Sequence, residues 1–276
     1  MQLFFDAGWA VSRFFGSILM GAHVVGREHL PKEGAFILAP NHLSYFDPPL
    51  VGSFVPRRVH FFAKQELFET PFLGFIVRRV NVHPVKRGAF DRNAIRTAVE
   101  TLKAGKPLTV FPEGTRGSRD KFLAPKPGIG MIARQAEVPI VPCYVEGTDT
   151  VWECILRKRR FHICYGPPIS ADWIRSLPSS KEAWLKIADE VMSRLTTLRA
   201  LVRGEEGGGT TTLSGDEFAA FDSQAEDSIE EVDTHAMALC VDGGVAEKRV
   251  RIEKKRSTNN KPLTNIMKRR LLFNMS

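Results

Sequence analysis

The sequence predicts an α/β fold with a mainly parallel central sheet flanked by helices. Short apolar runs alternate along the chain with longer segments whose apolar residues recur at helical spacing. Several of the short runs are apolar throughout, which is typical of strands covered on both faces. The composition agrees with this fold class, since 43% of the residues are hydrophobic and 25% are charged, as in globular proteins.

Five apolar runs are predicted to be strands. They are "AFILAP" at 35–40, "VHFFAK" at 59–64, "NVHPVK" at 81–86, "PLTVFP" at 107–112 and "IVPCYVEG" at 140–147. In a parallel sheet the functional side chains collect beyond the carboxyl ends of the strands. The loops that follow these runs are therefore the places to search for a site.

Three segments are predicted to be helices. They are residues 91–105, 130–136 and 179–203. Asp91 is expected to be the N-cap of the first helix, and Gly105 lies just past its end. Ser179 and Glu182 form a candidate capping box at the start of the third helix.

The apolar segment at residues 1–25 is predicted to be a helix that lies in a membrane interface. On a helical wheel one polar stripe about 60° wide holds Gln2, Asp6, Arg13 and Ser17, and the wider remaining face is rich in aromatic residues. The segment lacks the features of a signal peptide, and its longest uncharged stretch, 14–26, is too short to span a bilayer. The segment alone leaves a second reading open, in which the helix packs on the protein's own core.

The charge is unevenly distributed along the chain. The formal net charge is +8, but residues 1–203 hold 29 Lys or Arg against 18 Asp or Glu. A basic body suits a polyanionic partner: an anionic membrane, a phosphorylated substrate or nucleic acid. Residues 204–276 open with a Gly-rich linker composition and lack a periodic apolar pattern, so we expect a disordered tail, acidic first and then basic.

The four cysteines do not predict a metal site or a redox motif. Cys143, Cys154, Cys164 and Cys240 include no Cys-x-x-Cys pair, and no histidine follows one of them at zinc-finger spacing. They are best explained as buried thiols in a reducing compartment.

The first motif with chemical potential is "NHLSYFDP" at 41–48, directly after a predicted strand. His42 and Asp47 would not meet on a continuous helix, but the two prolines after Asp47 favour a turn in which Asp47 caps a new helix. Such a turn lets the carboxylate reach the imidazole, fix its tautomer and raise its basicity. The alternative is a capping aspartate beside a histidine that only packs.

The second motif is "FPEGTRG" at 111–117, again after a predicted strand. Gly114 permits close backbone approach to a ligand, and Thr115 offers a hydroxyl and an N–H. Arg116 offers a planar fork for bidentate phosphate binding. Glu113 either holds Arg116 in place or accepts a bond from a substrate hydroxyl. The alternative is an ordinary tight turn with a surface ion pair.

Taken in order, five segments resemble the glycerolipid acyltransferase family, with the 1-acyl-sn-glycerol-3-phosphate acyltransferases as the nearest match. They are "NHLSYFDP", "KQELFETPFLG", "VKRG", "FPEGTRG" and "VPIVPCYVEG". The resemblance covers roughly residues 20–170 and implies an acyltransferase domain at 26–203. It implies His42 as general base and Asp47 as its partner. The implied acceptor-phosphate site consists of Glu113, Gly114, Thr115 and Arg116, helped by Arg87.

The resemblance also implies a reaction: transfer of a fatty acyl group from acyl-CoA or acyl-carrier protein to the 2-hydroxyl of lysophosphatidic acid, at the cytoplasmic face of a membrane. A thioester is already activated, so the reaction needs an oriented hydroxyl and a base, and we expect no metal or cofactor. Two rivals stay open. One is an acyltransferase for another lysophospholipid or an acylated amino-acid lipid, and the other is a non-catalytic lipid-binding protein. Nucleic acid is not an expected partner, because the body shows no recognition fold for it.

Overall fold

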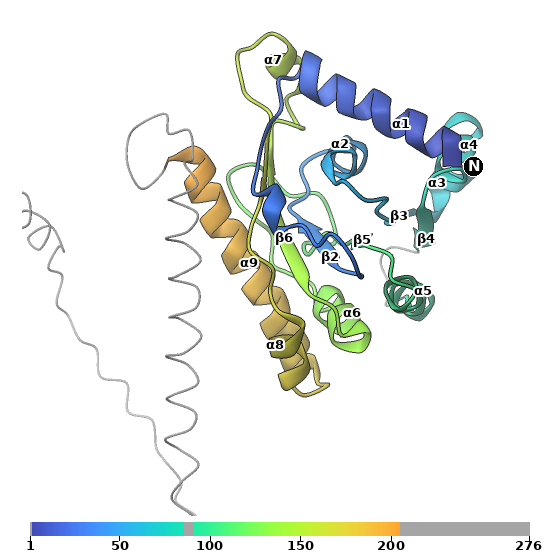
Figure 1. Ribbon diagram of the computed structural model, residues 1–276, viewed down its shortest axis with the longest axis vertical. Coiled ribbons are helices and arrows are strands. Elements are labelled where there is room, and N and C mark those ends of the chain that lie inside the picture. Colours follow the sequence, from blue (N-terminus) through green and yellow to red (C-terminus); the bar gives the residue numbers. More distant parts are fainter. Residues whose placement is uncertain (1, 86–90, 205–276) are drawn as a thin grey trace, which may run out of the picture. The chain divides into compact units, whose positions relative to one another are not determined.

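The computed structural model describes residues 2–85 and 91–204, which form the expected α/β fold (Figure 1). The helices are α1 (Gln2–Phe14), the π-helical turn η1 (Phe15–Leu19), the 3-10 turn η2 (Arg27–His29), α2 (Asp47–Phe54), α3 (Gln65–Glu69), α4 (Pro71–Val77), α5 (Arg92–Lys103), α6 (Gly128–Ala136), α7 (Val151–Ile155), α8 (Ala171–Ser176) and α9 (Lys181–Arg203). The strands are β1 (His23–Val25), β2 (Ile37–Pro40), β3 (Phe61–Lys64), β4 (Val82–Val85), β5 (Leu108–Thr109), β6 (Ile140–Glu146) and β7 (His162–Tyr165). Arg87 and residues 205–276 of the expected tail lie outside the described residues, so the predictions made for them stay predictions.

The sheet is mainly parallel, as predicted. Five strands follow the order β1-β7-β6-β2-β5, and of the pairings between the described strands β6 with β7 is the antiparallel one. β3 and β4 form a parallel pair that continues the sheet beyond β5. His60, just before β3, bridges to Leu108, and its carbonyl accepts a hydrogen bond of 2.8 Å from the Thr109 N–H.

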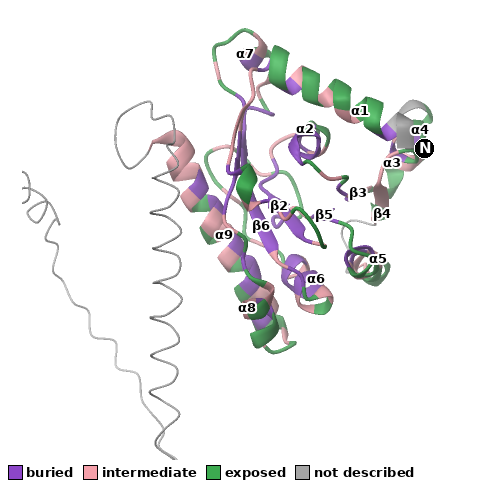
Figure 2. Ribbon diagram, in the orientation of Figure 1, coloured by how far each residue is buried: buried purple, intermediate pink, exposed green. Residues whose placement is uncertain are grey.

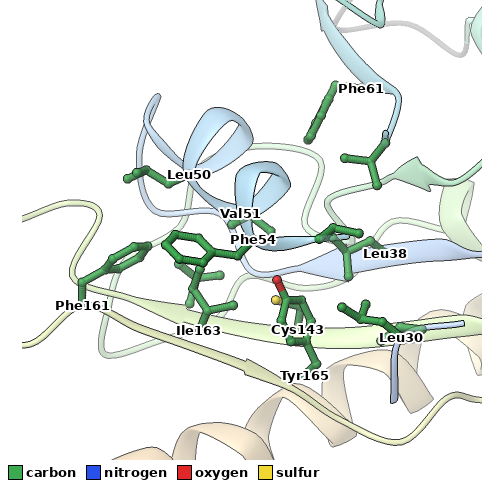
Figure 3. Packing of buried hydrophobic residues seen from close by; sticks show 14 of the residues in the cluster. Leu30, Leu38, Leu50, Val51, Phe54, Phe61, Cys143, Phe161, Ile163 and Tyr165 are labelled. Carbon is green, nitrogen blue, oxygen red and sulfur yellow. The ribbon is translucent and has the colours of Figure 1, made fainter. Parts of the chain in front are cut away.

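Both faces of β2 are covered, which explains why its sequence is apolar throughout. Leu38 packs in a cluster with α2, whereas its neighbours Ile37 and Ala39 pack on the opposite face with α5, α6 and α9. All three side chains are fully buried, and the buried strands run through the middle of the fold (Figure 2). Figure 3 shows the first cluster, in which Phe54 of α2 lies close to Phe161 and above Ile163.

The long helix α9 buries the face predicted for it. Val191 and Leu195 are fully buried, and Gly204 ends the helix with a left-handed backbone. The capping box expected at Ser179 is wrong by one residue. The Ser180 side chain is the N-cap and accepts a hydrogen bond from the Ala183 N–H.

The helix α1 combines the two readings of the N-terminal segment. On one side Trp9 stacks on the buried Phe5 and lies 6.0 Å from the ring of Phe61. On another side Val11 and Phe14 are 67% and 61% exposed. Part of the apolar face therefore packs on the domain, and part of it is uncovered. Within the described parts of the chain, no helix combines the length and the apolar character needed to cross a membrane.

Candidate active site

The loop between β2 and α2 brings His42 and Asp47 together. Asp47 Oδ2 lies 2.7 Å from His42 Nδ1 and accepts hydrogen bonds from the N–H groups of Leu43 and Ser44 at 2.7 and 2.8 Å. The turn expected from the prolines is confirmed. The capping role expected for Asp47 is wrong, because its carboxylate faces back into the preceding turn, and the start of α2 has no side-chain cap.

The imidazole of His42 is held on two sides. Asp47 is fully buried, and only 6% of His42 is exposed. The ring stacks on Phe111, with centroids 4.0 Å apart and planes 25° apart. The bond to Asp47 assigns the proton of the neutral ring to Nδ1, so Nε2 is the nitrogen with a lone pair that can accept a proton. The arrangement is that of an oriented general base.

Asn41, which the sequence analysis did not single out, attaches this loop to the sheet. Its side-chain amide donates to the Val145 carbonyl at 2.9 Å and accepts from the Val145 N–H at 2.7 Å. Because Asn41 is fully buried, the paired bonds fix the position of the residue before the base. The signal available in the sequence was the polar residue at the end of an apolar strand.

Glu113 links the second motif to the first. Its Oε1 accepts from the His42 N–H at 3.2 Å, and its Oε2 accepts from the Leu123 N–H at 2.8 Å. Burial raises the pKa of this carboxyl, while the two backbone N–H groups lower it, and burial is the larger effect. The reading in which Glu113 holds Arg116 is not what the structure shows, because both carboxylate oxygens are engaged with backbone amides.

A backbone bond completes the link between the motifs. The Gly117 N–H donates to the His42 carbonyl at 2.8 Å. A Cβ at Gly117 would lie 2.4 Å from Glu113 Oε2, so a larger residue would displace the carboxylate from the Leu123 N–H. Gly114 has a φ of 69°, in the left-handed region that favours glycine, and turns the chain outward after Glu113.

Arg116 lies on Tyr45, an aromatic residue of the first motif that the sequence analysis passed over. The guanidinium carbon is 3.8 Å from the centre of the Tyr45 ring, and Nη2 donates to the Tyr45 hydroxyl at 3.0 Å. Thr115 and Arg116 are exposed, and Tyr45 is 67% exposed. The stacked guanidinium is thus presented to solvent at the same edge of the sheet as the base, where an anion can reach it.

The structure places six of the seven predicted site residues at one edge of the sheet, and the seventh, Arg87, lies outside the described residues. Residues 2–85 and 91–204 contain no group of three or more His, Cys, Asp or Glu side chains that could hold a metal ion. The local arrangement offers one base, one positioning carboxylate and one exposed anion-binding group. These are the parts needed to deprotonate a hydroxyl on a phosphorylated molecule.

Comparison with known proteins gives consistent matches. Residues 21–146 match the family model described as Acyltransferase. The sequence is 30% identical over 183 residues to the 1-acyl-sn-glycerol-3-phosphate acyltransferase of Bacillus subtilis, a match that covers 66% of this chain and 90% of that protein. It is 32% identical over 160 residues to the yeast Saccharomyces cerevisiae protein of the same name, covering 52% of this chain and 51% of that one.

A solved structure is also similar. It is the crystal structure of the 1-acyl-sn-glycerophosphate (LPA) acyltransferase PlsC from Thermotoga maritima, with a TM-score of 0.54 and 31% sequence identity. The match covers 70% of this chain and 80% of that chain.

Proposed function

The chain belongs to the acyltransferase family of these relatives, and from this premise we propose that it acylates the 2-hydroxyl of 1-acyl-glycerol-3-phosphate. The product is phosphatidic acid, an intermediate of phospholipid synthesis. The acyl donor is acyl-CoA or acyl-carrier protein. The observation that carries the proposal is the 2.7 Å contact between His42 Nδ1 and Asp47, which leaves Nε2 as a base beside the loop of Arg116.

The reaction needs no group beyond the two substrates and these side chains. The acceptor hydroxyl attacks the thioester carbonyl as its proton passes to His42 Nε2, and the new C–O bond gives a tetrahedral intermediate. The C–S bond then breaks, and the imidazolium returns the proton to the departing thiolate. Asp47 stabilises the imidazolium while it exists. The thioester supplies the activation, so we propose that no metal or cofactor takes part.

Arg116 is the residue we assign to the acceptor phosphate. A phosphate monoester carries nearly two negative charges at neutral pH, and an arginine fork can bind two of its oxygens together. The stack on Tyr45 holds the guanidinium plane in one orientation before the acceptor arrives. Gly114 and Thr115 are exposed beside it and are assigned to the same contact. Glu113 acts from beneath this loop by fixing its position relative to His42.

We propose that the enzyme works at the cytoplasmic face of a membrane, with α1 in the interface. The apolar residues that α1 leaves exposed support this placement, as does the positive charge of residues 1–203. The membrane supplies the lysolipid and takes up the product. The cysteines of the domain, Cys143, Cys154 and Cys164, are free and buried, as expected in a reducing compartment.

The acceptor is tested by giving the purified full chain one acyl-CoA and a panel of lysolipids in detergent. We expect lysophosphatidic acid to be the best acceptor and lysophosphatidylcholine, with its blocked phosphate, to be poor. The His42→Ala variant serves as the control for contaminating activity. A preference for the choline lipid would favour the rival acyltransferase reading. Absence of transfer to every acceptor, with both acyl-CoA and acyl-carrier protein as donors, would favour a lipid-binding protein.

A further inference from the structure

A second apolar and basic surface lies on α7, outside the site described above. Trp152 and Leu156 are 77% and 63% exposed. The turn that follows carries Arg157, Arg159 and Arg160. We refer to these five residues as the α7 surface.

The α7 surface is attached to the end of the N-terminal helix. Arg157 Nη2 donates to the Ile18 carbonyl at 2.8 Å, and a Cβ at Gly21 would overlap the Arg157 guanidinium. α7 consequently lies beside the C-terminal end of α1 (Figure 1). Ile18 and Leu19 of η1 are themselves 56% and 40% exposed. Uncovered apolar residues thus lie on both of the elements that this contact joins, η1 and α7.

The α7 surface also lies at the catalytic edge of the sheet. β6 is parallel to β2, so α7, which follows β6, leaves the sheet at the same edge as the His42 loop that follows β2. β7 and β1 both start at this edge, with His162 paired to Glu146 on one side and to His23 on the other. A flat surface that touches η1 and α7 would therefore face the edge from which His42 takes its substrate.

A basic pocket adjoins the exposed apolar residues. Its volume is about 370 Å³, and its lining includes His23 and three arginines, Arg157, Arg159 and Arg160. Arg159 is paired with Glu153 at 2.8 Å. Arg160 is exposed and makes no hydrogen bond or ion pair with any other described residue, so its charge is available to a ligand.

A second arginine pair of the domain, Arg57 and Arg58, is committed within the protein. Arg57 donates to the carbonyls of Pro31 and Gly34, and Arg58 binds the Asp6 carboxylate of α1 through two nitrogens. The 157–160 turn differs from them, because the Arg160 charge is uncommitted and lies next to the uncovered side chains of Trp152 and Leu156. That combination complements an anionic lipid surface, which offers phosphates above an apolar layer.

We propose that the α7 surface is a second membrane anchor that docks on anionic phospholipid. Trp152 and Leu156 enter the apolar layer, and the arginine pocket binds a lipid phosphate. Together with the exposed side of α1, the α7 surface gives the domain two points of attachment and turns its catalytic edge toward the lipid. The proposal rests on the proposed function in one respect, since an enzyme with a lysolipid acceptor must meet its substrate at a membrane.

The first test is flotation of the full chain with phosphatidylcholine vesicles, with and without phosphatidylglycerol. Arg160→Gln removes one uncommitted charge and is expected to lower partition onto the anionic vesicles about fivefold, with little change on neutral vesicles. Trp152→Ala is expected to lower partition onto both, about tenfold. The matched control is Arg96→Gln, which removes one exposed charge from α5 and should leave partition within twofold. Equal losses for the Arg160 and Arg96 variants would overturn the phosphate pocket.

The second test asks whether Trp152 enters the bilayer. Vesicles with brominated acyl chains quench tryptophans that reach the apolar layer. Wild type is expected to lose a component of emission that the Trp152→Phe variant lacks. An identical quenched fraction in the two proteins would overturn insertion of Trp152. Neither measurement involves acyl transfer. The membrane-anchor proposal can therefore be refuted while the proposed function holds, and the proposed function can be refuted while the anchor holds. With substrates in detergent, the α7 variants should keep wild-type kcat.

Discussion

The two loops of the proposed active site differ in how many of their contacts are already made before substrate binds. In the 41–48 loop, His42 and Asp47 are buried, and each makes its contacts inside the protein. In the 113–117 loop, Thr115 and Arg116 are exposed, and Arg116 is held through Tyr45. The proposed base is thus fixed in the free enzyme, whereas the residue proposed to bind the acceptor phosphate is only oriented.

Because of this difference, we expect substitutions in the two loops to change different kinetic constants. A group fixed in the free enzyme that acts only as the hydroxyl loses its proton stabilises the transition state, so its loss lowers kcat. A group that binds a phosphate present in both substrate and transition state contributes binding energy throughout, so its loss raises KM. The substitutions below test whether the loss at the buried loop appears in kcat and the loss at the exposed loop appears in KM.

The largest effect is expected at the base. His42→Ala should lower kcat by about 10²–10⁴-fold, the usual contribution of a general base. Steady-state kinetics with lysophosphatidic acid give the value, and circular dichroism with thermal unfolding shows whether the domain is intact. A folded His42→Ala enzyme with a turnover within a few-fold of wild type would show that another group takes the proton.

A smaller effect is expected at the exposed loop. Arg116→Lys replaces a bidentate fork by a point charge and should lower kcat/KM for lysophosphatidic acid about 10–100-fold, mainly through KM. Lysophosphatidylcholine, whose phosphate is blocked, provides the comparison within the same protein. Equal losses on the two acceptors would break the assignment of Arg116 to a phosphate monoester.

Glu113 tests the connection between the two loops. Glu113→Ala leaves the N–H groups of His42 and Leu123 without their acceptor. Leu123 is 40% exposed, so its N–H can bond water, and the loss at the buried His42 N–H should destabilise the domain by about 1–3 kcal/mol. Urea unfolding measures this cost. Glu113→Gln, which keeps one acceptor oxygen, should lose less. A Glu113→Ala protein as stable as wild type would mean that the loops are held together without it.

The parts of the fold and of the candidate site that depend on local sequence pattern could be predicted from the sequence. The apolar strand at 35–40 predicted burial on both faces, and its carboxyl end predicted the place of the site, because these follow from layered α/β packing. β1 and β7 were missed, since β1 is three residues long and its parallel partner lies far along the chain. Their identity as strands depends on pairing that no local window contains.

The contacts predicted for individual side chains were wrong where a turn points residues close in sequence in different directions. Glu113 and Arg116 are three positions apart and of opposite charge, so an ion pair was a natural reading. The left-handed Gly114 between them directs Glu113 inward and Arg116 outward to Tyr45. Asp47 was expected to cap a helix, but its carboxylate is needed by the turn that precedes it. Such directions are set by the folded loop and not by residue type.

The smallest effect concerns a histidine pair away from the site, at β3 and β4. Burial lowers the pKa of His60 from 6.5 to about 4, and the neighbouring His83 and Lys106 add to the shift. Between these pH values the unfolded chain binds a proton that the folded domain does not, so the free energy of unfolding should fall as pH drops from 6.5 toward 4. Urea unfolding over this range should show a shallower dependence for His60→Gln. The same pH dependence of the free energy of unfolding in wild type and His60→Gln would show that His60 is not its cause.

The central claim, that the buried loop carries turnover and the exposed loop carries acceptor binding, is tested most directly by one pair of variants. Asp47→Asn and Arg116→Lys are assayed side by side for kcat and KM with lysophosphatidic acid at a saturating acyl donor. We predict that Asp47→Asn lowers kcat about 10²-fold or more with KM near wild type, because the imidazolium loses its carboxylate. We predict that Arg116→Lys changes mainly KM. A wild-type kcat for Asp47→Asn, or a loss in Arg116→Lys that lies in kcat alone, would contradict the account.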